Sequence, residues 1–198
     1  MSELSREAVR RALAESIELK EKLRGDNAFL DQVVRMAGVL VKALRDGNHL
    51  YLCGNGGSAS DAQHLATELV GRFQKTRAAL PALALNTDTA LLTAVANDDG
   101  FPNVFARQIE AFVRSGDVLM VISTSGNSPN VLEAARRGRA LGARVLGLSG
   151  RDGGKLRSLC DECLVVPHEL TCRIQEVHIT VGHILCDIVE ESLAPEGQ

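Results

Sequence analysis

Residues 117–142, DVLMVISTSGNSPNVLEAARRGRALG, decide the fold class of this chain. The stretch opens with a continuous apolar run, passes through hydroxyl-bearing residues and a glycine, and continues with apolar residues at helical spacing. Ser128 and Pro129 are typical of a helix start, because serine caps free N–H groups and proline suits the first helical position. A buried strand that leads through a polar turn into a helix predicts an α/β protein with a parallel sheet.

The same alternation of strand and helix extends over the rest of the chain. Four further short apolar runs are bounded by Gly, Ser, Asn or Pro, and helical patterns separate most of the runs. Because near-continuous apolar strands are typical of parallel sheets with both faces covered, we expect a five-stranded parallel sheet between two layers of helices. The expected strands cover 49–54, 80–86, 117–124, 144–150 and 163–168, and the expected helices cover 58–73, 89–96, 103–113, 129–141 and 172–193.

The first 48 residues carry only helical patterns. Val9, Leu13 and Ile17 recur at four-residue steps, and a second helix over 27–46 is apolar on more than one side. Such a helix needs several apolar neighbours, so we expect it to pack against the same helix of another subunit. We predict a single domain over 1–198, in which the helices of 1–48 pack in an oligomer and 49–198 form the α/β core.

Composition and charge exclude several classes of protein. The chain has 22 basic and 25 acidic residues, a net charge of −3 and six aromatic residues, which argues against a nucleic-acid binder. It has no apolar run of the ~20 residues that a membrane helix needs and no secretory signal, so we expect a cytoplasmic protein without membrane contact. The odd number of cysteines predicts reduced thiols at Cys53, Cys160, Cys163, Cys172 and Cys186.

Cys160, Cys163, His168 and Cys172 have the spacing C-x2-C-x4-H-x3-C, which is one residue short of a zinc knuckle. A knuckle would keep residues 164–166 out of the predicted sheet. Structural zinc is therefore the less favoured interpretation, and the role of the two cysteines at 160 and 163 stays open.

A glycine-rich loop follows the first expected strand, in CGNGGSAS at 53–60. Gly54, Gly56 and Ala59 match the dinucleotide fingerprint, but the next strand ends in Asn86 rather than in an acidic residue, and the chain has no GK[ST]. The loop is therefore neither a dinucleotide site nor a nucleotide P-loop. It either brings its backbone close to another ligand at a helix N-terminus or is a plain tight turn.

A hydroxyl-rich loop, STSGNS at 123–128, follows the third expected strand. Four hydroxyls at a strand-to-helix turn suit a phosphate monoester that is held by hydroxyl and backbone N–H groups. The alternative is helix capping alone, which needs only one hydroxyl. We expect an anion site at the carboxyl end of this strand, where ligands bind in such sheets.

Two helices carry candidate acid–base or metal-binding residues. His64, Glu68 and Arg72 are spaced by four and share one helix face. Gln175 and His183 lie eight apart on the last helix, in apolar surroundings. A surface ion pair and a core histidine are the ordinary alternatives, and spacing alone does not tell whether the two helices meet.

Five segments in order resemble the sugar isomerase (SIS) domain family and, within it, the phosphoheptose isomerase family. The resemblance spans most of residues 30–193 and implies an SIS-type three-layer α/β/α sandwich with an N-terminal helical extension. The segments are CGNGGSASDAQHLATELVGRF, NTDTALLTAVANDDGF, GDVLMVISTSGNSPNVLEAARRGRALG, LSGRDGGKL and RIQEVHITVGHILCDIVE.

The resemblance also implies an activity and an assembly. It implies a homotetramer with sites between subunits, which converts sedoheptulose 7-phosphate to D-glycero-D-manno-heptose 7-phosphate through an enediol, the first step toward activated heptose. Glu68 and His183 would be the catalytic acid–base pair, and Zn²⁺ would be bound by His64, Glu68, Gln175 and His183. The residues implied to bind substrate are Asn55, Gly56, Gly57, Ser58, Glu68, Arg72, Asn97, Asp98, Ser123, Thr124, Ser125, Ser128 and Gln175.

A non-catalytic tetrameric adaptor of the same fold, similar to replication-initiation regulators, is the alternative. Those relatives lack the glutamate and the final histidine, so Glu68 and His183 favour the enzyme. We further expect Glu68 to reach a sugar bound at the glycine loop, because the helix that carries it starts there. We expect burial to keep His183 neutral.

Overall fold

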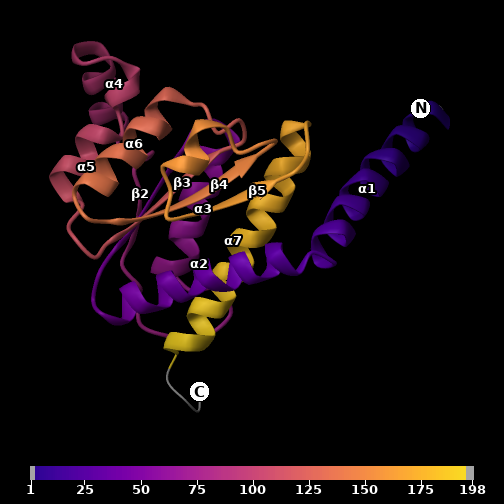
Figure 1. Ribbon diagram of the computed structural model, residues 1–198, viewed down its shortest axis with the longest axis horizontal. Helices are drawn as coiled ribbons and strands as arrows, with labels where there is room; N and C mark the ends of the chain where they lie inside the picture. The colour runs from indigo at the N-terminus through magenta and orange to yellow at the C-terminus, as the bar shows by residue number, and fades with distance from the viewer. Residues whose placement is uncertain (1–2, 195–198) are drawn as a thin grey trace.

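Five parallel strands form the central sheet of the computed structural model, which describes residues 3–194 (Figure 1). The strands are β1 (Leu50–Gly54), β2 (Ala82–Ala84), β3 (Val118–Ser123), β4 (Arg144–Gly150) and β5 (Glu162–Val166). The α-helices are α1 (Glu3–Arg24), α2 (Asn27–Arg45), α3 (Gly57–Val70), α4 (Thr89–Asp98), α5 (Ala106–Phe112), α6 (Pro129–Ala140) and α7 (Thr171–Leu193), and the short 3₁₀ helices are η1 (Phe101–Asn103) and η2 (Gly154–Ser158).

The sheet order is β2-β1-β3-β4-β5, and every neighbouring pair is parallel. The chain moves outward in one direction from β1 to β2 and in the other from β3 to β5, so the order reverses between β1 and β3. Ligands in open α/β sheets bind at such a reversal, beyond the carboxyl ends of the strands. The glycine loop follows β1 and the hydroxyl loop follows β3, so both loops lie at this point.

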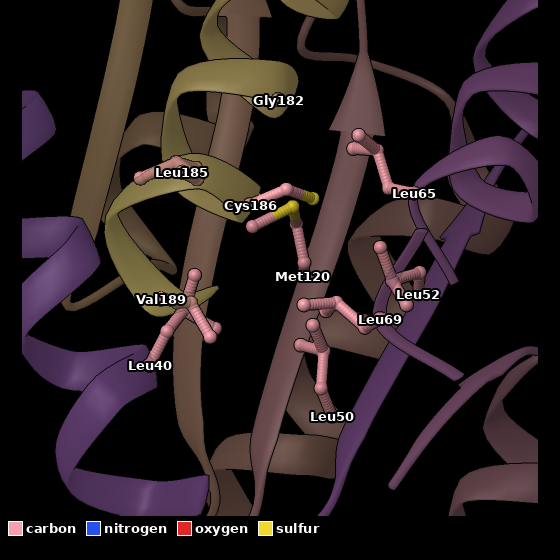
Figure 2. A pocket seen from close by; sticks show the side chains of 10 residues that line it. All are labelled: Leu40, Leu50, Leu52, Leu65, Leu69, Met120, Gly182, Leu185, Cys186 and Val189. Atoms are coloured by element: carbon pink, nitrogen blue, oxygen red, sulfur yellow. The ribbon is translucent and has the colours of Figure 1, made fainter. Parts of the chain in front are cut away.

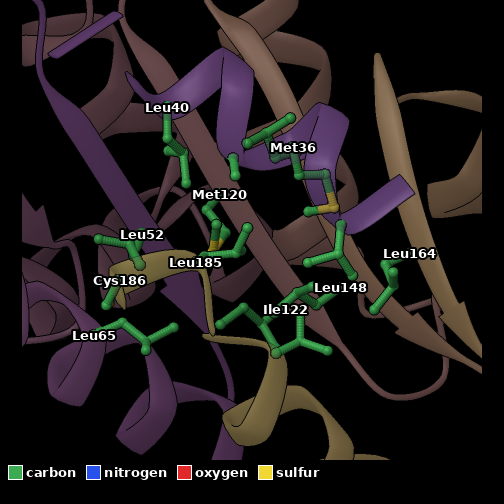
Figure 3. Close-up of a cluster of buried hydrophobic side chains, with 14 of the residues drawn as sticks. Met36, Leu40, Leu52, Leu65, Met120, Ile122, Leu148, Leu164, Leu185 and Cys186 are labelled. Atoms are coloured by element: carbon green, nitrogen blue, oxygen red, sulfur yellow. The ribbon is translucent and has the colours of Figure 1, made fainter. Parts of the chain in front are cut away.

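Each strand divides its apolar side chains between two cores, because successive residues point to opposite faces. Leu52 and Met120 lie in the core with α2, α3 and α7, whereas Cys53 and Val121 lie in the core with α5 and α6. This arrangement confirms the predicted three-layer sandwich. Figure 2 shows apolar side chains from β1, β3, α3 and α7 around a space of only about 10 Å³, too small for a sugar phosphate. Figure 3 shows the wider cluster, in which α2 packs over the sheet.

The first two helices have different surroundings. Asp26 caps α2, because its Oδ1 accepts the N–H groups of Ala28 (2.9 Å) and Phe29 (3.2 Å). Most of the apolar surface of α2 is covered by its own chain, which leaves Leu30 and Val34 as its exposed large apolar residues. The prediction that α2 needs a second subunit to cover its several apolar sides is therefore wrong for most of the helix.

Helix α1 extends away from the body of the molecule (Figure 1). Among its apolar residues, Leu19 and Leu23 are buried against the core. The predicted stripe of Val9, Leu13 and Ile17 is instead 59–61% exposed. None of the helices within residues 3–194 is long and apolar enough to cross a membrane.

Several predicted boundaries shift. The helix expected over 58–73 ends at Val70, where the Gly71 N–H closes the last turn on the Thr67 carbonyl (2.8 Å). The helix expected over 103–113 is instead η1, which contains Pro102, followed by the short α5. The strand expected over 80–86 contracts to the three residues of β2, which lies at the edge of the sheet.

Candidate functional site

The loops after β1 and β3 are joined by a reciprocal pair of side-chain amides. Asn55 Nδ2 donates to Asn130 Oδ1 (2.8 Å), and Asn130 Nδ2 donates to Asn55 Oδ1 (2.9 Å). Asn130, in the first turn of α6, is 1% exposed. Sequence analysis missed Asn130, although its place directly after Ser128-Pro129 marked it as part of the same turn. We call residues 55–58 and 123–128 together the glycine–serine cradle.

The hydroxyls of the cradle do not serve as helix caps. Ser128 occupies the N-cap position of α6, but its side chain makes no capping hydrogen bond, and its Oγ lies 3.0 Å from Ser123 Oγ. Ser125 Oγ accepts the N–H of Asn127 (3.2 Å). Capping alone, the plain alternative for this loop, therefore does not explain its hydroxyls. The loop gathers them at the N-terminus of α6, where the helix dipole favours an anion.

Gln175 reaches the cradle from the first turns of α7. A Cβ on Gly57 would lie 2.4 Å from Gln175 Nε2, so a side chain at position 57 would force this amide to move. The close approach places Gln175 beside the backbone at the start of α3. Gln175 therefore belongs with the cradle in the single chain.

A second group forms where α3 and α7 meet. His64 Nε2 and His183 Nε2 are 2.8 Å apart, and Glu68 Oε1 lies 3.3 Å from His64 Nε2. One ligand atom from each of the three residues falls within 4.8 Å of the others. We call His64, Glu68 and His183 the imidazole–carboxylate cluster. The structure thus settles what spacing left open, because the two predicted helices do meet.

Asp61 and Phe73 flank this cluster, and sequence analysis missed both. Asp61 lies one turn before His64 on α3, and its Oδ2 is buried without a hydrogen-bond partner among residues 3–194. Burial raises the pKa of Asp61, and the charges of His64 and His183 oppose that rise. The Phe73 ring stacks on the His183 imidazole, with ring centroids 5.6 Å apart and planes inclined by 29°.

Glu190 of α7 holds the segment that carries Phe73. Its carboxylate accepts the N–H groups of Phe73 (3.0 Å), Gln74 (2.6 Å) and Lys75 (2.7 Å). Arg77 Nε lies 3.0 Å from Glu190 Oε1, and the two side chains are 2% and 1% exposed. Burial alone would raise the pKa of Glu190, but the three N–H groups and the Arg77 charge outweigh it and lower that pKa. The carboxylate therefore fixes the chain that follows α3 against α7.

His178 belongs to the core rather than to the site. It is fully buried, and its Nε2 donates to the Ser149 carbonyl (2.9 Å), since a carbonyl oxygen only accepts. Burial lowers the pKa of His178 to about 4, against a weaker opposing effect of that hydrogen bond. His178 is therefore a hydrogen-bonded core histidine, the ordinary alternative for a histidine on an apolar helix. His183 instead contacts His64 of α3.

Residues 13–150 match the family model described as the SIS domain. The chain is 60% identical over 158 residues to the phosphoheptose isomerase of Pelobacter propionicus. The aligned residues make up 80% of this chain and 84% of that protein. The chain belongs to the phosphoheptose isomerase family. It is also 50% identical over 185 residues to the phosphoheptose isomerase of Aquifex aeolicus (93% of this chain, 96% of that protein). The solved phosphoheptose isomerase from Francisella tularensis superposes with a TM-score of 0.90 at 36% identity (96% of this chain, 100% of that chain).

Two site residues predicted from the family pattern do not lie where spacing placed them. Arg72 is exposed beyond the end of α3, so it does not share a helix face with His64 and Glu68, and that prediction is wrong. Glu68 follows Gly57 by eleven residues, which is about 16 Å along the helix axis. The expectation that Glu68 reaches a sugar in the cradle of its own chain is therefore also wrong.

Other residues implied by the phosphoheptose isomerase pattern lie apart from the cluster in one chain. Gln175 and His183 are eight residues apart, about 12 Å along α7, so Gln175 contacts the cradle while His183 meets His64. Asn97 and Asp98 are exposed at the end of α4, where Asn97 Nδ2 donates to Asp98 Oδ1 (2.7 Å). Their roles in substrate binding stay predictions.

The donor set fits a metal at the imidazole–carboxylate cluster and nowhere else in the described part of the chain. Two imidazole nitrogens and a carboxylate oxygen are ordinary Zn²⁺ ligands, and they converge without an intervening side chain. The zinc-knuckle residues do not gather in this way within residues 3–194, because His168 Nδ1 accepts the N–H of Leu170 instead (3.0 Å).

Proposed function

We propose that this chain is an aldose–ketose isomerase that converts sedoheptulose 7-phosphate to D-glycero-D-manno-heptose 7-phosphate. The observation that carries the proposal is the convergence of His64, Glu68 and His183 from two helices. The adaptor alternative needs no such convergence, because a surface that only binds a protein gains nothing from aligned proton-transfer groups. Membership of the phosphoheptose isomerase family supports the substrate class.

The phosphate of the sugar would lie in the glycine–serine cradle. Ser123, Thr124, Ser125 and Ser128 offer hydroxyls there, and the α6 N-terminus adds a favourable dipole. The Asn55–Asn130 amide pair holds the two loops in register, so the backbone of Gly56 and Gly57 and the Ser58 side chain face the same ligand. These neutral hydroxyl and N–H donors suit a phosphate dianion at a helix N-terminus.

Glu68 would move the proton between the two carbon atoms. A carboxylate takes one hydrogen of C1 as a proton, and the electron pair of that C–H bond forms the C1–C2 double bond of an enediol. The same carboxyl then returns a proton to C2, while the carbonyl forms at C1. The transfer needs a base within hydrogen-bond reach of both carbons, and such a base contributes about 10²–10⁴-fold to the rate.

His183 would exchange protons with the O1 and O2 oxygen atoms of the sugar. As the C2 carbonyl becomes a hydroxyl it gains a proton at O2, and the C1 hydroxyl loses one from O1 as the aldehyde forms. An imidazole can donate at one oxygen and accept at the other, because its two protonation states are both accessible near neutral pH. The Phe73 ring stacked on His183 keeps this imidazole in one plane.

We propose that Zn²⁺ is held by His64 Nε2, Glu68 Oε1 and His183 Nε2. Gln175, which the family implies as a fourth ligand, would come from a neighbouring subunit, because it lies with the cradle in its own chain. When bound, zinc supplies Lewis-acid polarisation of a carbonyl oxygen. Because His183 Nε2 cannot bind zinc and exchange a proton at the same time, Glu68, whose second carboxylate oxygen keeps acceptor capacity, would then share both proton-transfer roles. Zinc content of the purified protein, measured by mass spectrometry of the metal, should fall to background in His64→Gln, whereas a Cys172→Ser control keeps it.

We further propose a homotetramer in which each site combines residues from different subunits. In one chain the cradle lies at the start of α3, whereas Glu68 lies in the last turn of α3, about 16 Å away along the helix axis. A second copy that places its cluster over the cradle would complete the site. The exposed stripe of α1 and the exposed Asn97, Asp98 and Arg72 are available for that neighbour.

An isomerisation assay tests the activity directly. Purified protein is mixed with sedoheptulose 7-phosphate, and the aldose product is followed by NMR, with and without added zinc. We expect the C1 proton signal of the aldose to appear. Absence of turnover under both conditions would leave the adaptor reading. Light scattering then tests the assembly, and a stable monomer of about 21 kDa at micromolar concentration would contradict the shared site.

A further inference from the structure

Cys160 and Cys163 form a pair of thiols that the isomerase site does not use. Cys160 precedes β5 and Cys163 lies in its amino-terminal half, away from the carboxyl ends of the strands where the cradle is. Both sulfur atoms lie within 3 Å of the position that a Cβ would take on Gly147 of the neighbouring strand. The C-x2-C spacing noted in the sequence therefore brings the two sulfur atoms to the same small space beside β4.

The neighbouring strand makes room for this contact. Gly147 of β4 is paired with Cys163, and a Cβ on Gly147 would lie 2.7 Å from Cys160 Sγ and 2.9 Å from Cys163 Sγ. Any other residue at position 147 would push into both sulfur atoms. The absence of a side chain there creates the space that the two thiols share.

The pair borders an open surface pocket of about 330 Å³, lined among others by Gln32, Arg157 and both cysteines. The neighbouring Cys160 thiol lowers the pKa of Cys163, burial opposes that effect, and the Arg157 charge supports it. The neighbouring Cys163 thiol raises the pKa of Cys160. Cys163 is therefore the thiol that ionises more readily, and Cys160 is placed to react with it in a second step.

The other three cysteines have different surroundings. Cys53 and Cys186 are buried, as Cys163 is, but neither lines the surface pocket, and burial raises the pKa of both thiols. Cys172 is exposed at the start of α7. Within the described residues, the 160–163 pair alone combines a thiol partner, a lowered pKa and access from a pocket.

We propose that Cys160 and Cys163 are a dithiol modification site that reacts with small-molecule disulfides to form an intramolecular disulfide. The Cys163 thiolate attacks one sulfur of the oxidant RSSR, which gives a mixed disulfide and releases one RS⁻. The Cys160 thiolate then attacks Cys163 Sγ, closes the Cys160–Cys163 bond and releases the second RS⁻. The two thiol protons end on the two released thiols. Two protein thiols are oxidised, and one RSSR is reduced to two RSH.

Peptide mass spectrometry tests the proposal. Trypsin cuts after Arg157 and Arg173, so Cys160, Cys163 and Cys172 share one peptide, and the test uses the Cys172→Ser protein. After treatment with oxidised glutathione and alkylation of the remaining thiols, we expect peptide 158–173 to be two hydrogen atoms lighter and to carry no alkyl group. A peptide alkylated at both cysteines, or carrying two glutathione adducts, would overturn the proposal.

Single substitutions in the same background test the order of attack. Cys160→Ser should accumulate glutathione on Cys163, because the resolving thiol is gone. Cys163→Ser should form its adduct on Cys160 at least tenfold more slowly. Equal rates would overturn the assignment of Cys163 as the attacking thiol. Isomerase activity of each variant, compared with Cys172→Ser, should be unchanged before oxidation, since neither thiol lies in the cradle or in the cluster, so this test is independent of the proposed function.

Discussion

His64 and His183 are 119 residues apart in the chain, and their Nε2 atoms meet at 2.8 Å. The contact depends on the residue next to each of them, because Leu65 of α3 packs against Gly182 of α7. A Cβ on Gly182 would lie 2.6 Å from Leu65 Cδ2, so the glycine sets how closely the two helices approach. The imidazole–carboxylate cluster is therefore a consequence of helix packing.

Gly182→Ala should separate α3 from α7. Overpacking of this kind costs about 1–3 kcal/mol of unfolding free energy, and the cluster should lose part of its isomerase activity with it. Gly38→Ala on α2 is the matched control, because nothing lies within 4 Å of its Cβ position. That variant should gain about 0.5–1 kcal/mol from helix propensity. Urea unfolding measures the stability of the two variants, and steady-state kinetics give their kcat. An unchanged stability and kcat in Gly182→Ala would contradict the packing argument.

Glu68→Gln should remove the proposed base while it keeps the shape of the side chain. We expect kcat to fall by about 10²-fold or more, with an unchanged circular dichroism spectrum. Glu133, a half-buried residue that pairs with Arg136 on α6, offers a control, and Glu133→Gln should keep its activity. A folded Glu68→Gln protein with nearly full activity would rule out Glu68 as the base.

Glu190→Gln should destabilise the segment that carries Phe73. The carboxylate accepts three backbone N–H groups, whereas an amide would point an N–H group of its own at part of them. The buried Arg77 charge would also lose its partner. We therefore expect the unfolding free energy to fall by about 3–5 kcal/mol. Glu191, the adjacent residue, pairs with Lys75 at the surface, and Glu191→Gln should change stability by about 0.5 kcal/mol or less. Similar stabilities of the two variants would show that Glu190 is not a structural anchor.

His178 should make stability depend on pH. Its pKa is about 4 in the folded protein, and a histidine in the unfolded chain has a pKa near its ordinary value of 6.5. The unfolded chain thus binds more protons between these values, so stability falls as the pH drops from about 6.5 to about 4. The loss should amount to about 3 kcal/mol. In His178→Gln this part of the slope disappears, and urea unfolding at several pH values, compared with the wild type, measures the difference.

Ser125→Ala should weaken phosphate binding by the cradle. Loss of one hydrogen bond to a desolvated dianion costs about 1–3 kcal/mol, which corresponds to a KM raised by roughly 5- to 150-fold at similar kcat. Ser158, exposed in η2, provides the control substitution Ser158→Ala, which should leave KM unchanged. A wild-type KM in both Ser125→Ala and Ser123→Ala would place the phosphate elsewhere.

The sequence by itself determined the elements and the loops that carry chemistry. The expected strand 144–150 coincides with β4, because a continuous apolar run bounded by Gly is readable without knowledge of its neighbours. The two polar loops were predicted for the same reason, since each directly follows a strand whose carboxyl end must face the ligand side of the sheet. These features depend on local spacing and on turn chemistry.

Only the tertiary structure decided which of these parts meet. Helical spacing places His64 and Glu68 on one face, but it does not say that α7 covers that face or that α3 ends before Arg72. The strand order 2-1-3-4-5 brings the loops at 55 and 130 together. The physical reason is that periodicity describes one element at a time, whereas contacts between elements follow from the packing of buried side chains that are distant in sequence.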